Sequence, residues 1–137
     1  MTTHKIVKSW TTEAGLPAVI LLVNDGSHHC GYVALPADLV KKKKKDFINF
    51  GSEVCISVHG GVTYQDALPQ LEDKIAIGFD CAHYGDLMKC PEKYKGTPLE
   101  GMHMYTEGVW RDEQYCTDEC ESMAKQIMAM LPKQLEG

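Results

Sequence analysis

The chain has 137 residues and carries 14 Lys and Arg against 19 Asp and Glu, which gives a formal net charge of −5. A chain of this length buries roughly two thirds of its unfolded surface in one core, so we expect a single domain over residues 1–137. Hydrophobic residues at 44% exclude a disordered chain. The acidic balance disfavours nucleic-acid polymers as partners, because their binding depends on Lys and Arg that neutralise phosphates.

The sequence contains no segment typical of a membrane-spanning or secreted protein. Its longest apolar run, residues 16–23, is interrupted by Pro17 and is far shorter than the roughly 20 residues that cross a bilayer. Residues 1–10 lack the apolar stretch and the cleavage site of a signal peptide. We therefore expect a cytoplasmic protein without a membrane partner, in which the six Cys are thiols.

Two runs near the start of the chain predict a β-hairpin. Residues 17–24 are apolar, rich in β-branched side chains, and end at the turn signal Asp25-Gly26. Residues 30–35 follow a short polar turn, and we expect them to form the partner strand.

Residues 37–50 predict a short helix that contains five adjacent lysines, Lys41–Lys45. We interpret the lysines as a solvated surface because like charges repel one another. A phosphate-facing arm is the alternative.

The rest of the chain predicts two further strands and a long helix. Residues 53–59 and 74–80 alternate apolar and polar side chains, as half-buried strands do. Residues 81–112 are rich in Gly and Pro without a period, and long loops of this kind are frequently functional. From Glu113 to Pro132 apolar residues recur every three or four positions. The predicted fold is α+β: a mainly antiparallel sheet of about four or more strands, a C-terminal helix packed on one face, and a long Gly/Pro-rich loop.

Side chains that carry chemistry follow two of the predicted strands. They lie in His59-Gly60-Gly61-Val62-Thr63-Tyr64 and in Gly78-Phe79-Asp80-Cys81-Ala82-His83-Tyr84-Gly85-Asp86. In a tight hairpin of residues 53–59 and 74–80 the two groups lie at opposite ends. They meet only if the connection over residues 65–73 crosses back, or if a partner subunit brings them together.

The second group predicts either a binding site or a catalytic one. Asp80 and His83 are three residues apart, a spacing that lets the carboxylate orient the imidazole. In the catalytic interpretation His59 and His83 are the acid and base, with Asp80 as the orienting group. Cys81 is then a candidate nucleophile, provided that a histidine lowers its pKa. In the structural alternative Asp80 caps a turn, Cys81 is buried and His83 makes a structural hydrogen bond.

Two further features suit a nucleotide. Gly60 and Gly61 allow successive backbone N–H groups to surround a phosphate, although Gly-Gly also makes ordinary turns. Trp110-Arg111 places the one arginine of the sequence beside an aromatic ring, with a salt bridge to a neighbouring acid as the alternative.

No Cys-x-x-Cys or His-x-x-x-His pair is present, so we expect no metal and no cofactor. The alternative is a divalent ion held by His59, Asp80, His83 and Asp86.

Four motifs resemble those of a family of small proteins encoded by phages and prophages, over about residues 30–127. They are Gly31-Tyr32-Val33, His59 to Tyr64, Gly78 to Asp86, and Tyr115 with Glu119-Cys120. The resemblance implies a phage-type protein in the cytoplasm of a bacterial host. Small phage proteins of this kind resemble counter-defence proteins that sequester or cleave nucleotide immune signals, such as cyclic ADP-ribose isomers or cyclic oligonucleotides.

The leading hypothesis is therefore a homo-oligomeric protein that binds and sequesters a small nucleotide-derived signal. In it His59, Gly60 and Gly61 hold phosphate. The other expected ligand-binding residues are Thr63, Tyr64, Asp80, His83, Tyr84, Asp86, Trp110 and Arg111. The alternatives are a hydrolase or phosphodiesterase with the His/Asp/Cys site above, and a protein–protein inhibitor that uses the acidic residues between 100 and 121. Whether the protein is an enzyme stays open at this point.

Overall fold

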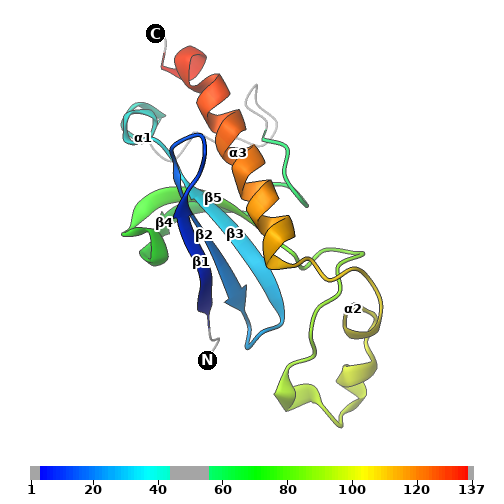
Figure 1. The fold of residues 1–137 in the computed structure, drawn as a ribbon. Coiled ribbons are helices and arrows are strands. Elements are labelled where there is room, and N and C mark those ends of the chain that lie inside the picture. The colour runs from blue at the N-terminus through cyan, green and yellow to red at the C-terminus, as the bar shows by residue number, and fades with distance from the viewer. Residues whose placement is uncertain (1–3, 44–55, 136–137) are drawn as a thin grey trace.

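The computed structural model describes residues 4–43 and 56–135, and there it forms a five-stranded antiparallel sheet in the order β1-β2-β3-β5-β4 (Figure 1). The strands are β1 (Lys5–Thr11), β2 (Pro17–Val23), β3 (His28–Ala34), β4 (Tyr64–Leu68) and β5 (Lys74–Asp80). The helices are α1 (Ala37–Lys43), α2 (His103–Thr106) and α3 (Glu113–Gln134), with short 3₁₀ helices η2 (Pro69–Leu71), η3 (Glu92–Tyr94) and η4 (Pro98–Gly101). The long helix α3 packs across one face of the sheet, which confirms the predicted α+β fold.

Strands β2, β3 and β5 and helix α3 confirm elements predicted from the sequence. Strands β1 and β4 were not predicted, because neither alternates clearly: β1 has no buried residue, and β4 buries only Leu68. Helix α1 confirms the start of the helix predicted over residues 37–50, while residues 44–50 lie outside the described residues. Helix α3 continues two residues past Pro132, the predicted stop.

The strand predicted over residues 53–59 is wrong for its described part, residues 56–59, and residues 53–55 lie outside the described residues. This segment runs beside α3 instead of joining the sheet. The Ser57 N–H donates to Gln126 Oε1 at 2.7 Å, and Gln126 Nε2 donates to the Ser57 carbonyl at 2.7 Å. One side-chain amide of the helix thus satisfies the backbone groups that a neighbouring strand would otherwise pair.

Each face of the sheet has its own apolar cluster. On the α3 face, Ile20, Ile77 and Phe79 pack with Met123 and Ile127 of the helix. Gly31 makes this approach possible, since a Cβ there would lie 2.8 Å from Cys120 Sγ. Fully burying each such side chain contributes about 1.5–3 kcal/mol.

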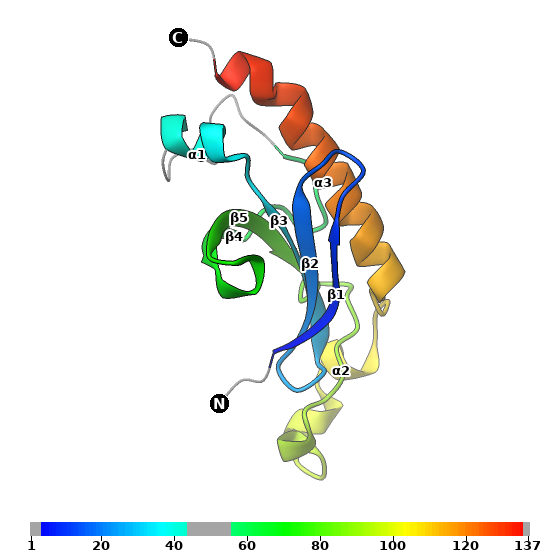
Figure 2. The same ribbon diagram turned by 60° about the vertical axis from the view of Figure 1, so that its left-hand side comes forward.

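On the opposite face, β4 and η2 curl over the sheet (Figure 2), and Leu68 and Leu71 cover Val19 and Leu21.

Residues 81–112 hold short helices between irregular stretches and extend beyond the N-terminal end of α3 (Figures 1 and 2). Backbone hydrogen bonds attach them to the body of the protein. The Lys89 N–H donates to the Ser27 carbonyl at 2.8 Å, and the Cys81 N–H donates to the His29 carbonyl at 3.0 Å. Within the segment, the Val109 N–H donates to the Gly85 carbonyl and the Leu87 N–H donates to the Val109 carbonyl, at 2.9 Å each. Among the described helices, none is long and apolar enough to span a bilayer.

Candidate functional site

The β4–β5 hairpin brings the two predicted groups of polar residues together. Tyr64 pairs with Gly78, and the Thr63 N–H donates to the Gly78 carbonyl at 2.9 Å. Residues just before β4 therefore lie beside residues just after β5, and the ring centroids of His59 and His83 are 5.8 Å apart. The tight hairpin of residues 53–59 and 74–80, which would separate the two groups, is not formed, because the strand that pairs with β5 begins after His59.

Asp86 lies at the centre of a buried polar network near the N-terminal end of α3. Its side chain is 1% exposed and accepts hydrogen bonds from His59 Nε2 at 2.8 Å and Arg111 Nε at 2.9 Å. A third comes from the His83 N–H at 3.1 Å. Burial alone would raise the pKa of the Asp86 carboxyl, but the three hydrogen bonds outweigh it and lower that pKa. Asp86 is therefore an internal anion that lines neither of the two clefts described below, and its role as a ligand-binding residue stays a prediction.

His59 is fully engaged by the same network. Besides Asp86, its Nδ1 lies 2.8 Å from the Tyr115 hydroxyl, and its backbone N–H donates to Glu119 Oε1 at 2.7 Å. If the neutral ring donates from Nε2 to Asp86, Nδ1 accepts from Tyr115. This carboxylate–imidazole–hydroxyl arrangement resembles a catalytic relay. His59 lines neither of the two clefts described below, however, so we interpret the network as a structural tie.

Gly60 and Gly61 form a turn rather than a phosphate cradle. Both have positive φ, +69° and +85°, and the Gly61 N–H donates to the Val58 carbonyl at 2.8 Å. The role that we predicted for them is therefore not supported. Gly60 matters for another reason: a Cβ there would lie 2.2 Å from His83 Nε2, so only glycine allows His83 its position.

Trp110 and Arg111 do not share a subsite. Arg111 binds Asp86, and its guanidinium carbon lies 4.9 Å from the centroid of the Tyr115 ring. Trp110 instead contacts His29, at 5.3 Å between ring centroids. The structure thus favours the salt-bridge alternative for Arg111 over the predicted nucleotide subsite.

Cys81 does not have the environment of a nucleophile. It is 2% exposed, and its Sγ lies 3.6 Å from Cys116 Sγ. The contact with Cys116 and burial both raise the pKa of the Cys81 thiol. The buried, structural alternative fits Cys81 better. The five described cysteines are all thiols, and Cys55 lies outside the described residues.

Asp80 and His83, in contrast, line an open cleft of about 550 Å³. The cleft lies on the sheet face opposite α3, since Cys30 and Tyr32 of the second apolar cluster also line it. Other residues around it include His4, His28, Thr63 and Tyr64.

Within this cleft Asp80 accepts hydrogen bonds from Thr63 Oγ1 at 3.0 Å and from the Ala82 N–H at 3.1 Å. His83 Nε2 lies 3.2 Å from Asp80 Oδ1, so the predicted pairing of these residues is formed. The His83–Asp80 contact does not have the geometry of a hydrogen bond. In the described part of the chain the buried His83 Nε2 therefore has no hydrogen-bond partner. The ring of Tyr64 meets that of Tyr32 edge to face at 5.3 Å.

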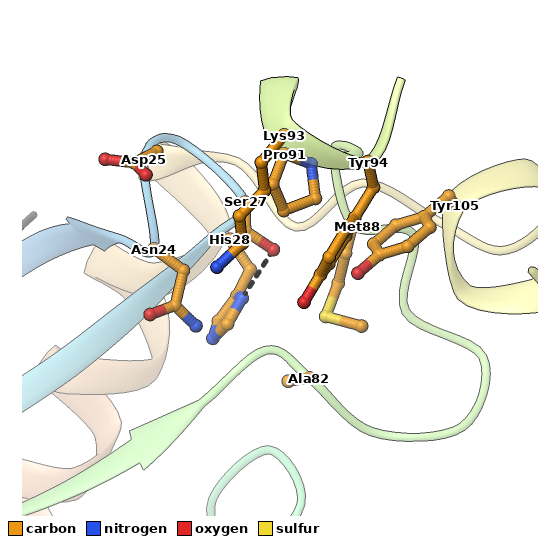
Figure 3. Close-up of a pocket in the computed structure, with 10 residues that line it drawn as sticks. All are labelled: Asn24, Asp25, Ser27, His28, Ala82, Met88, Pro91, Lys93, Tyr94 and Tyr105. Carbon is orange, nitrogen blue, oxygen red and sulfur yellow. Dashed lines mark hydrogen bonds between the residues drawn. The ribbon is translucent and has the colours of Figure 1, made fainter. Parts of the chain in front are cut away.

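A second cleft of about 520 Å³ adjoins the first (Figure 3). Asn24, His28 and Ala82 line both clefts, and Tyr94 and Tyr105 line only the second. Sequence reasoning missed these tyrosines because the segment that carries them has no period to indicate which side chains point inward. The predicted ligand residue Tyr84 lines neither cleft; it is 95% exposed and stacks on His103.

No group of three or more side chains suited to a metal ion occurs within residues 4–43 and 56–135. No protein-family model, curated protein or solved structure matches the chain. The resemblance to phage proteins therefore depends on the sequence motifs alone.

Proposed function

We propose that the protein binds a small nucleoside-derived ligand in the cleft at Asp80 and sequesters it unchanged, in the cytoplasm of a bacterial host. One observation carries the proposal: Thr63, Tyr64, Asp80 and His83, all expected from the sequence to contact a ligand, line the same cleft. Its volume is within the roughly 300–1,000 Å³ of small-molecule sites.

The charges in the cleft favour the nucleoside part of such a ligand. The Asp80 carboxylate accepts hydrogen bonds from hydroxyl and amino groups, and Tyr32 and Tyr64 offer ring surface to a base. No Lys or Arg is among the described residues that line this cleft, and Asp80 repels a phosphate. We therefore place the base and ribose at Asp80 and direct any phosphate away from it.

Binding is favoured over cleavage because two of the four predicted catalytic residues are occupied elsewhere. His59 is held by Asp86, Tyr115 and Glu119, and Cys81 is buried against Cys116. Asp80 and His83 alone retain access to the cleft, and a hydrolase would have to use this pair as its general base.

The protein–protein inhibitor hypothesis receives less support. Glu119 accepts from the His59 N–H, and Glu121 accepts from Trp10 Nε1 at 3.1 Å. Asp112 accepts from the Tyr115 N–H at 2.8 Å and so caps α3. Three acids of the predicted surface are therefore structural. Self-association stays a prediction, which sedimentation with and without ligand can test.

Calorimetric titration with adenosine, adenosine 3′,5′-cyclic monophosphate and cyclic ADP-ribose tests the proposal. We expect at least one to bind, and Asp80→Asn to weaken it by about 10-fold or more, because hydrogen bonds to charged groups contribute about 1.5–3 kcal/mol. Asp73→Asn, at an exposed turn, is the matched control. Failure of all three to bind at about 1 mM, or equal binding by Asp80→Asn, would overturn the proposal.

A further inference from the structure

The two clefts adjoin at the end of the β2–β3 hairpin. Asn24 and His28 come from this hairpin and line both clefts, and Ala82, just after β5, completes the shared boundary. On the far side of the second cleft, Tyr94 and Tyr105 extend from residues 92–106 toward Met88 and the His28 side (Figure 3). A ligand seated at Asp80 therefore has a second, similar volume within reach.

His28 is the buried polar residue at the junction, whereas Asn24 is exposed. His28 is 7% exposed, and its Nδ1 lies 3.1 Å from Ser27 Oγ, a contact that fixes the ring (Figure 3). Burial lowers the pKa of His28, so the ring is neutral near pH 7. Nε2 has no hydrogen-bond partner among the described residues. Among the described residues His83 Nε2 is the one buried side-chain nitrogen or oxygen without a partner, so His28 Nε2 keeps contact with solvent, where it can form a hydrogen bond with a ligand atom at the junction.

Each cleft offers a pair of tyrosine rings. Tyr32 and Tyr64 line the first and Tyr94 and Tyr105 line the second, and all four are partly buried. Aromatic side chains of this kind stack on nucleobases without selecting one base. Two pairs in adjoining clefts provide room for two ring systems.

The charges of the two clefts differ. The first contains Asp80 and no described lysine, whereas the second contains both Lys93 and Asp25. The Lys93 ammonium lies 5.2 Å from the centroid of the Tyr94 ring, at the rim of the second cleft. A phosphate is therefore repelled in the first cleft and tolerated at the junction or beyond it.

We propose, building on the function proposed above, that the ligand is of the dinucleotide class. One nucleoside lies at Asp80, the phosphate linker passes His28, and the second ring system lies at Tyr94 and Tyr105. His28 Nε2 is the atom that meets the linker or its neighbouring ribose.

Titrations with adenosine and with the dinucleoside monophosphate adenylyl-(3′,5′)-adenosine test this proposal. We expect the dinucleoside to bind at least about 10-fold more tightly, because a second stacked base contributes about 1–3 kcal/mol. Tyr105→Leu should reduce this affinity ratio toward one. Tyr84→Leu is the matched control, because Tyr84 lines neither cleft, and it should keep the ratio.

At the junction, His28→Leu should lower the ratio and His28→Gln, which retains a polar end, should lower it less. Far-ultraviolet circular dichroism of each variant reports that it is folded. Equal affinities of wild type for the two probes, or a ratio that Tyr105→Leu leaves unchanged, would overturn the two-cleft proposal while the function proposed above stands. Failure of both probes to bind would overturn both.

Discussion

Arg111 Nε donates a hydrogen bond to Asp86 Oδ1 at 2.9 Å, across 25 residues of sequence. On its other side the same carboxylate binds His59, which follows the segment that runs beside α3. One buried anion thus ties together the loop after β5, the turn before β4 and the start of α3. The walls of the candidate cleft depend on this tie, because His83 belongs to the loop that Asp86 closes.

Asp86→Asn should therefore destabilise the fold. The asparagine amide keeps the shape of the carboxyl but loses its charge. Its NH₂ group also replaces one of the two oxygens that accept hydrogen bonds from His59, Arg111 and the His83 N–H. We therefore expect a loss of about 1–3 kcal/mol in the free energy of unfolding. Urea denaturation measures it. Asp73→Asn is the control, since Asp73 is exposed and asparagine tolerates its positive φ of 60°. Equal midpoints for the two variants would show that the network contributes little.

The same comparison should depend on pH. The folded-state pKa of Asp86 is lowered, so its contribution is complete above the unfolded carboxyl pKa of about 4 and is lost as pH falls below it. The difference in unfolding free energy between wild type and Asp86→Asn should narrow below about pH 4. Burial lowers the pKa of His28, and the Asp86 charge acts against this by raising it, so the His28 contribution differs between the two proteins and the test is the narrowing below about pH 4. A difference that does not narrow there contradicts this account of Asp86.

Gly60→Ala and Gly61→Ala form a matched pair. Both place alanine at positive φ, and each should lose about 1–2 kcal/mol of stability for that reason. A Cβ at position 60 meets His83, whereas a Cβ at position 61 has no described atom beyond its chain neighbours within 4 Å. In calorimetry, adenosine binding should weaken about 10-fold for Gly60→Ala and stay within about twofold for Gly61→Ala. If the two variants bind alike, His83 has no part in the site.

Thiol alkylation separates a buried from a reactive Cys81. In the folded protein, iodoacetamide should modify the half-buried Cys90 before Cys81 or Cys116, because burial keeps the latter two from solvent and the pKa of Cys81 is raised. Peptide mass mapping assigns each alkylated product to its cysteine and so separates modification of Cys55 from that of the other five. Cys81→Ala should retain ligand binding. Rapid modification of Cys81 would restore the nucleophile hypothesis.

The sequence predicted those parts of the fold whose pattern reflects burial. Residues 17–23 are buried on both faces of the sheet and are apolar throughout, residues 74–80 alternate in sequence, and α3 has an apolar stripe, so each segment has a recognisable pattern. The error at residues 56–59 has a physical cause. An extended segment that packs against a helix alternates as a strand does, and the sequence does not show that Gln126 provides its hydrogen bonds.

The candidate site was only partly predictable for the same reason. The motif spacing identified Asp80 and His83, but the pairing of Tyr64 with Gly78, which decides their neighbours, is a long-range contact. The sequence also singled out Arg111 as its one arginine, without indicating that Arg111 would form a salt bridge with Asp86. Composition gave the net charge of −5, yet the distribution of charge between the two clefts follows only from the fold.

The most direct test of the central claim is recovery of a sequestered ligand. The protein is incubated with adenosine, cyclic ADP-ribose and cyclic di-AMP, the free pool is separated by filtration, and the protein fraction is heat-denatured and analysed by chromatography. We expect one compound to leave the free pool and to return chemically intact after heating, and Asp80→Asn to prevent its capture. New products in place of the intact compound would contradict sequestration, and a free pool that stays undepleted would contradict binding itself.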